Sequence, residues 1–170
     1  IGLGQNRDWL SQLNQKLHLF DSLVVGHFNI EFLVGDPESD EGPRGFFKFY
    51  RELWDEQPLG LRPVDDPLDL LEKNADGSPI RNNSYSIGGM KEYWACLNNP
   101  HWRTVLKAWV RHGIDQGLDG FMINYFYRHN CLCDHCQSAF RDYLDDRFDA
   151  AKLKTQFGIT DLAAHKFTEI

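Results

Sequence analysis

The sequence contains no apolar run that approaches the roughly 18–20 residues needed to span a bilayer, and its first residues lack the pattern of a signal peptide. It also lacks a basic cluster, because 18 Lys and Arg stand against 25 Asp and Glu, for a formal net charge of −7. Binding to nucleic acid through a basic surface is therefore disfavoured, since phosphate binding depends on clustered cations. The sequence predicts no membrane partner and no nucleic-acid partner.

Regular patterns are scarce between residues 35 and 98, where Gly, Pro, Asp and Asn are frequent. We predict a long loop region over 35–98, interrupted by two short helices. One follows Pro43, and the other is capped by Asp66 with Pro67 in its first turn. A connection of this length inside a compact domain is usually functional.

Outside that region, helices and strands alternate. Apolar residues recur at helical spacing over 8–20 and predict an amphipathic helix that covers one side of a core. Further helices are predicted from the Asn99 cap to Gly117 and over about 136–148, and strands over 23–34 and about 121–124. Alternation of this kind favours a parallel α/β sheet in a single unit.

Polar side chains alternate with apolar ones along the first predicted strand. His27, Asn29 and Glu31 fall on one face and Phe28 and Ile30 on the other. The polar face is either part of a binding site or an ordinary polar strand face.

Cysteine is scarce, with four residues in the chain, yet three of them lie within six residues, at Cys131, Cys133 and Cys136. A disulfide within this cluster is a poor explanation, because the bridge needs a set geometry that Cys-x-Cys rarely provides. Thiolates are strong zinc ligands, and a structural zinc takes four Cys or His ligands in a tetrahedron. We predict a zinc loop over 129–136, completed by Cys96.

The fourth zinc ligand has two substitutes, His129 and His135, and the alternative to a metal site is four free thiols. Unpaired thiols favour a reducing or zinc-buffered compartment, such as the cytoplasm, over an oxidising one.

Two stretches, "ACLNNPHWRTVL" and "GFMINYFYRHNCLCDHCQSAFRDYL", resemble the zinc-containing β-galactosidases of glycoside hydrolase family 42 and related barrels. The resemblance covers about 87–144 and implies zinc binding by Cys96, Cys131, Cys133 and Cys136. It also aligns Asn124 with an Asn of the family that precedes the acid/base Glu. The implied function is carbohydrate processing.

The resemblance implies a (β/α)8 TIM barrel, which typically needs about 250 residues. A chain of 170 residues that begins with Ile is then expected to be one fragment of the barrel, from roughly the second helix to the fourth. The strand that carries the nucleophilic Glu would lie outside it. The full-length protein would be a candidate for homo-oligomer formation.

At the position of the acid/base Glu the chain has Tyr125, and a phenol is a poor proton shuttle near neutral pH. Candidate catalytic residues are therefore Asn124, Tyr125 and Glu31, the last as a replacement carboxylate. Candidate substrate-binding residues are His27, Asn29, Trp94 and Arg128. Trp94 is otherwise a core residue, and Arg128 otherwise forms a salt bridge.

Three functions follow from these patterns: a glycosidase, a barrel that binds carbohydrate without hydrolysing it, and a zinc-stabilised interaction module unrelated to sugar.

Overall fold

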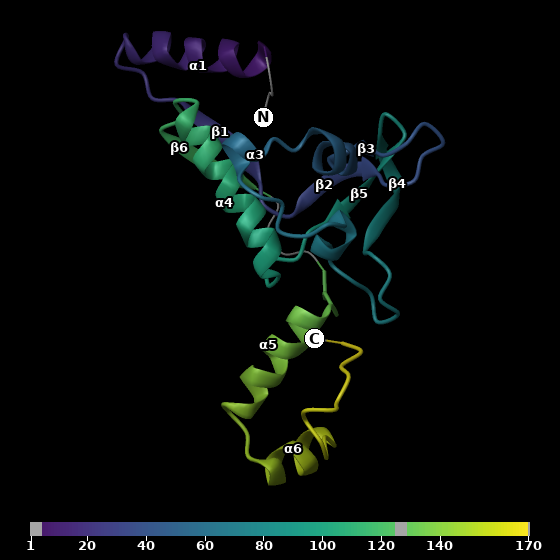
Figure 1. Cartoon of the computed structure of the whole chain (residues 1–170). Coiled ribbons are helices and arrows are strands. Elements are labelled where there is room, and N and C mark those ends of the chain that lie inside the picture. Colours follow the sequence, from purple (N-terminus) through teal and green to yellow (C-terminus); the bar gives the residue numbers. More distant parts are fainter. Residues whose placement is uncertain (1–4, 125–128, 170) are drawn as a thin grey trace.

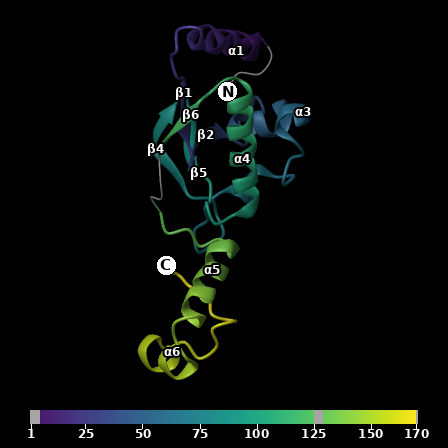
Figure 2. The ribbon, with the colours of Figure 1, turned by 90° about the vertical axis from the view of Figure 1, so that its left-hand side faces the viewer.

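The computed structural model describes residues 5–124 and 129–169, which form a mixed α/β structure with two sheets (Figure 1). Strands β1 (Val25–Asn29) and β6 (Gly120–Asn124) form a parallel pair. Strands β2 (Phe32–Asp36), β3 (Arg44–Gly45), β4 (Arg81–Ile87) and β5 (Met90–Trp94) form an antiparallel sheet in the order β3-β2-β5-β4. In the two views, helix α1 (Gln5–His18) lies at one end of the molecule, and α5 (Asp134–Asp145) and α6 (Ala150–Phe157) lie at the other (Figures 1 and 2).

Helix α4 (Pro100–Asp115) connects the antiparallel sheet to β6, and it begins where the capping signals predict. The Asn99 side chain accepts a hydrogen bond from the His101 backbone N–H, and Pro100 occupies the first turn, where no amide donor is needed. Gly117, with a φ of 89°, ends the helical region in a conformation that favours glycine. The predicted helix and the parallel strand after it are both confirmed.

Helix α4 packs on one face of the β1–β6 pair. The Phe28 ring meets the Trp109 ring of α4 edge-on, with centroids 6.1 Å apart. A Cβ at Gly113 would lie 2.9 Å from the Phe121 ring, so glycine lets the helix approach β6 closely. The opposite face of the pair has exposed apolar side chains, at Val25 and Met122.

The prediction of one strand over 23–34 is wrong in detail. The chain bends at Ile30 and Glu31, so that β1 joins the parallel pair and β2 joins the antiparallel sheet. The bend is fixed by hydrogen bonds from the Ile30 N–H to the Asn124 carbonyl and from the Trp102 indole N–H to the Ile30 carbonyl, at 3.2 and 2.7 Å. Alternation of side chains is a local pattern and cannot reveal that the two halves have different partners.

The region 35–98 is more regular than the sequence predicts, because it supplies β3, β4 and β5. The strands β4 and β5 are joined at Gly88 and Gly89, both with positive φ. Two glycines between strand-like segments are a hairpin signal that the prediction of a loop overlooked. The two predicted short helices are confirmed: α2 (Phe46–Lys48) with the π-helical η1 (Phe49–Leu53), and the 3₁₀ helix η2 (Pro67–Leu70) capped by Asp66.

The main core lies between the antiparallel sheet, the 46–53 helical segment and α4. Its buried residues are Leu33, Phe46, Phe47, Tyr50, Leu70, Leu71, Tyr93, Ala95, Trp102 and Val105. A second, smaller cluster, formed by Leu144, Leu153, Ile159 and Phe167, holds α5, α6 and the C-terminal segment together. We call residues 134–169, which contain this second cluster, the C-terminal unit.

Helix α1 forms where predicted but does not cover a core with its apolar stripe. Trp9 and Phe20 are 65% and 78% exposed. Two polar contacts hold α1: the Asn14 amide donates to the Gln116 carbonyl at 2.8 Å, and His18 contacts Asp119 at 2.9 Å.

The described residues form no closed barrel, so the structure shows a mixed α/β fold but does not show the predicted partial TIM barrel. Among the described helices, none is both long enough and apolar enough to cross a membrane.

Candidate metal centre

The four cysteines meet at the junction between the main core and the C-terminal unit. Their sulfur atoms all lie within 4.8 Å of one another, although Cys96 is 35 or more residues from the other three in sequence. The Cys96 and Cys136 sulfurs are 3.4 Å apart, and those of Cys96 and Cys133 are 3.6 Å apart. All four are free thiols, and three of them are buried.

This arrangement fits a tetrahedral metal ion. Four sulfurs at the Zn–S distance of about 2.3 Å would be about 3.8 Å from one another, close to the observed separations. A disulfide would require about 2.05 Å. The cluster is therefore consistent with a metal site that fills all four positions with thiolates, which is the arrangement of structural rather than catalytic zinc.

The chain positions each cysteine by a different local feature. Cys96 follows β5, and its backbone N–H donates to the Leu70 carbonyl at 2.9 Å. Cys131 lies in a segment tied to the chain before β4, because the Leu132 N–H donates to the Lys73 carbonyl at 2.8 Å. Cys133 is the residue before α5, and Cys136 is in the first turn of that helix. The loop over 129–136, called the metal loop below, thus connects the main core to the C-terminal unit.

Two hydrogen-bond donors point at the sulfurs. The Lys73 backbone N–H lies 3.5 Å from the Cys131 sulfur, and the Asn98 amide nitrogen lies 3.3 Å from the Cys136 sulfur. Donors of this kind stabilise thiolate charge and orient metal ligands. Sequence reasoning missed both residues, because their contacts depend on the fold and no spacing in the sequence indicates them.

A group of buried polar side chains adjoins the metal centre. The Glu72 carboxylate is 3.1 Å from the His129 Nδ1, and the His129 ring packs against Trp94 with centroids 4.3 Å apart. Burial, followed by the nearby Cys131 thiol and the Glu31 carboxyl, raises the pKa of Glu72 to about 8.

Glu31 and Trp94, which were predicted to act in catalysis and substrate binding, lie in this buried region. Their exposed fractions are 1% and 4%. Glu31 belongs to the bend after β1 and not to a strand face shared with His27 and Asn29. Of the two proposed substitute ligands, His129 contacts Glu72 and the His135 ring faces the His101 ring at 6.4 Å, so the cysteine cluster forms without either.

A second polar group lies at the carboxyl ends of the parallel strands. Asn29 and Asn124 are paired in the β1–β6 register, and the Asn124 amide is 3.3 Å from the His27 Nε2. The structure therefore brings together three of the predicted site residues, His27, Asn29 and Asn124. Tyr125 and Arg128, also predicted to act here, lie outside the described residues.

Comparison of the chain with models of protein families, with curated protein sequences and with solved structures found no match. The function is therefore inferred from the geometry of the chain itself.

Proposed function

We propose that the chain is part of a glycoside-hydrolase-like (β/α)8 barrel that binds or processes carbohydrate and carries a structural zinc beside its binding site. The observation that carries the proposal is the contact between His27 and Asn124 at the carboxyl ends of two parallel strands. Sites of barrel enzymes lie at this end of the strands, where loops and strand ends meet.

The β1–α4–β6 unit supports the barrel part of the proposal. Helix α4 covers one face of the parallel pair, while Val25 and Met122 on the other face are 60% and 61% exposed. In a barrel, helices cover the outer face and side chains from further strands fill the inside. The exposed face is thus where additional strands of a barrel would pack.

The cysteine cluster supports zinc as the metal. Four thiolates are the soft, tetrahedral donor set that zinc favours in structural sites. Because the four sulfurs complete the coordination, the ion would supply no open position for a substrate, and its role would be to hold the metal loop in place.

The strand-end group supports an uncharged, hydroxyl-rich ligand. The amides of Asn29 and Asn124 can each donate and accept hydrogen bonds, and the His27 imidazole can do either. A sugar offers hydroxyl groups that need both donors and acceptors, whereas an anionic ligand would favour Arg or Lys, as on a phosphate site.

A carbohydrate-binding barrel without hydrolysis is the second candidate. Tyr125 occupies the sequence position where the resembled enzymes have their acid/base Glu. Retaining glycosidases need two carboxyl groups about 5–5.5 Å apart, one of them as the proton donor. Without that Glu, the amide of Asn124 could still bind a sugar.

Calorimetric titration of the purified chain with methyl β-D-galactoside, and with a panel of other methyl glycosides, tests carbohydrate binding. Asn124→Ala should weaken binding by about 1–3 kcal/mol, since a sugar hydroxyl then loses its partner. The matched control is Asn74→Ala, because Asn74 is exposed and contacts Ser78 away from the strand ends. Absence of binding to every glycoside, or equal loss in both variants, would contradict the proposal.

Aryl glycoside hydrolysis tests whether this chain carries a catalytic group of its own. The chain alone should not turn over these substrates, because the proposed barrel fragment lacks the strand with the nucleophile. Tyr125→Phe should leave sugar binding nearly unchanged. Turnover that Tyr125→Phe or Glu31→Gln abolishes would instead identify a catalytic group within this chain.

A further inference from the structure

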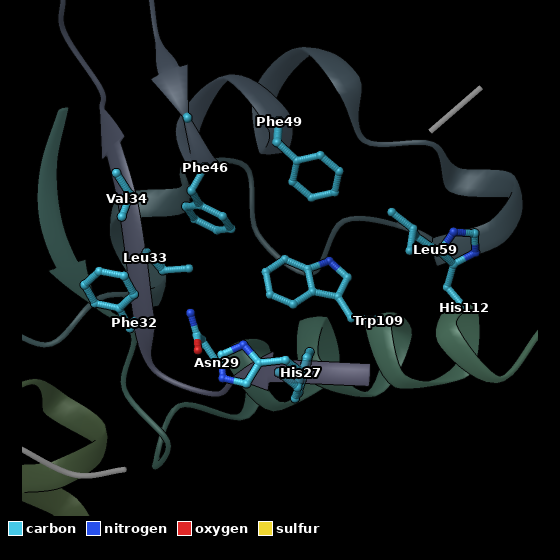
Figure 3. A pocket seen from close by; sticks show the side chains of 12 residues that line it. His27, Asn29, Phe32, Leu33, Val34, Phe46, Phe49, Leu59, Trp109 and His112 are labelled. Carbon is cyan, nitrogen blue, oxygen red and sulfur yellow. The ribbon is translucent and has the colours of Figure 1, made fainter. Parts of the chain in front are cut away.

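A cavity of about 430 Å³ lies where β1, β2, the 46–53 segment, α3 (Glu56–Leu59) and α4 meet (Figure 3). This volume is within the range of small-molecule binding sites. Its lining includes the rings of Phe46, Phe49 and Trp109 and the polar side chains of His27, Asn29 and His112. The metal centre contributes none of them.

The lining contains no Asp, Glu, Lys or Arg, so no carboxylate, ammonium or guanidinium group faces the cavity. An ionised ligand would lose its hydration here without gaining a counter-charge, which costs several kcal/mol. The cavity therefore selects for uncharged ligands.

Aromatic rings form much of the wall. Trp109 lies 6.2 Å from Phe46 and 6.1 Å from Phe49, with interplanar angles of 82° and 59° (Figure 3). Rings in contact at such angles turn both edges and faces toward the cavity. A flat ring in the cavity can therefore make the stacked and edge-to-face contacts that aromatic pairs prefer.

The polar groups His27 and Asn29 lie side by side at one side of the cavity (Figure 3). The His27 side chain is exposed, and its imidazole can donate or accept a hydrogen bond. A ligand hydroxyl that leaves water for the cavity can therefore keep a hydrogen-bond partner there.

We propose that this cavity binds an uncharged aromatic ring that carries a hydroxyl group, that is, a neutral phenol. The ring packs against Phe49 and Trp109, and the hydroxyl forms a hydrogen bond with the His27 imidazole. The inference does not rest on carbohydrate binding, although a phenolic group attached to a sugar at the strand ends could enter the same cavity.

The test is calorimetric titration with p-cresol, which is neutral at pH 7, and with 4-hydroxybenzoate, which adds a carboxylate to the same ring. We expect p-cresol to bind at one site and 4-hydroxybenzoate to bind at least about tenfold more weakly. Equal affinity for the two compounds, or no binding of p-cresol, would overturn the proposal.

Variants locate the site. Phe49→Ala removes one aromatic wall and should weaken p-cresol binding about tenfold. Leu53→Ala is the matched control, since Leu53 is in the same helical segment, is 52% exposed and does not line the cavity. Val34→Phe, which fills the cavity and keeps an apolar side chain, is the second variant and should also abolish binding. Unchanged binding in Val34→Phe, or the same loss in Leu53→Ala, would place p-cresol elsewhere.

Methyl β-D-galactoside distinguishes this proposal from the carbohydrate one. Binding of p-cresol without binding of any methyl glycoside supports the cavity and contradicts the sugar site. The reverse result contradicts the cavity alone.

Discussion

Single side chains around the four sulfurs make the metal centre testable. Cys136→Ser removes one of four ligands and leaves three thiols without the ion that organises them. We expect the variant to lose stoichiometric zinc and about 3 kcal/mol or more of unfolding free energy, because metal binding at such sites is coupled to folding. Elemental analysis and thermal unfolding measure both effects.

The control for this variant is Ser138→Ala, two residues along α5, where the side chain is exposed. It should retain one zinc per chain. Full reactivity of all four thiols in the zinc-loaded wild-type protein would contradict the metal site altogether.

Asn98 tests whether donors to the sulfurs adjust metal affinity. Its amide lies 3.3 Å from the Cys136 sulfur, and Asn98→Ala removes this donor while all four ligands remain. We expect metal binding to weaken about tenfold, the lower end of the effect of such contacts. Competition with a chromophoric chelator measures the change, and the exposed substitution Ser138→Ala should leave the affinity within about twofold.

The sequence predicted the cysteine ligands but not the residues that support them. Three cysteines at Cys-x-Cys-x-x-Cys spacing are a local signal. Cys96 was predicted as the fourth ligand because it is the remaining cysteine and because the stated resemblance implies it. The contacts of Lys73, Asn98 and Glu72 depend on how β5, the preceding segment and the metal loop meet in space. No periodicity in the sequence carries that information.

Among the elements, those with local signals were predictable. Helix α4 has its Asn cap, its first-turn proline and its terminal glycine, and β6 is a continuous apolar run. The division of 23–34 into two strands was not predictable, because it is imposed by the Ile30 contacts with Asn124 and Trp102. The position of α1 was missed for a related reason: its fully buried residue is Asn14, a polar one, while Trp9 and Leu17 of its apolar stripe remain exposed.

The bend between β1 and β2 should depend on Trp102. Its indole N–H donates to the Ile30 carbonyl at 2.7 Å, and its side chain is fully buried. Trp102→Phe leaves that carbonyl without its donor and a gap in the core, so we expect a loss of about 1–3 kcal/mol in denaturant unfolding. Trp9→Phe is the matched control, because Trp9 is 65% exposed, and should change stability by less than about 0.5 kcal/mol. Equal effects would mean that the Trp102 contact contributes nothing.

The start of the parallel pair should respond to acid through Asp119. Its carboxylate accepts from the Val24 N–H at 2.7 Å and contacts His18 at 2.9 Å, and these bonds lower its pKa below the ordinary 3.8. A carboxyl with a lowered pKa contributes stability that is present above the ordinary value and is lost as pH falls through the folded-state value.

Asp119→Asn should therefore flatten the decline of stability below about pH 4 that the wild-type protein shows. Unfolding curves between about pH 2 and pH 6 measure it. Asp115→Asn, at the exposed end of α4, serves as the control and should leave the decline of stability at low pH unchanged. The same decline of stability in Asp119→Asn as in the wild type would show that these bonds do not change the pKa of Asp119 on folding.

Across the molecule, the metal centre joins two parts that each have their own apolar cluster. The main core surrounds Trp102, and the C-terminal unit surrounds Leu144 and Leu153. The C-terminal unit is also tied internally, since Gln137 both donates to and accepts from the Phe167 backbone at 2.8 and 3.0 Å. The charge and composition of the sequence could not indicate this division, because both parts have ordinary amphipathic patterns.

Removal of the metal should therefore loosen the junction before either part unfolds. Hydrogen exchange of the whole chain, measured with zinc and after chelation, tests this. We expect faster exchange at the Leu132 and Cys96 amides, whose hydrogen bonds to Lys73 and Leu70 cross the junction or flank it. Amides within the β1–β6 pair, and the Leu153 amide within the C-terminal unit, should remain protected because their bonds do not involve the metal loop. Uniform acceleration throughout the chain would mean that the metal stabilises the entire fold as one cooperative unit, and unchanged exchange at Leu132 would mean that protein contacts alone hold the two parts together.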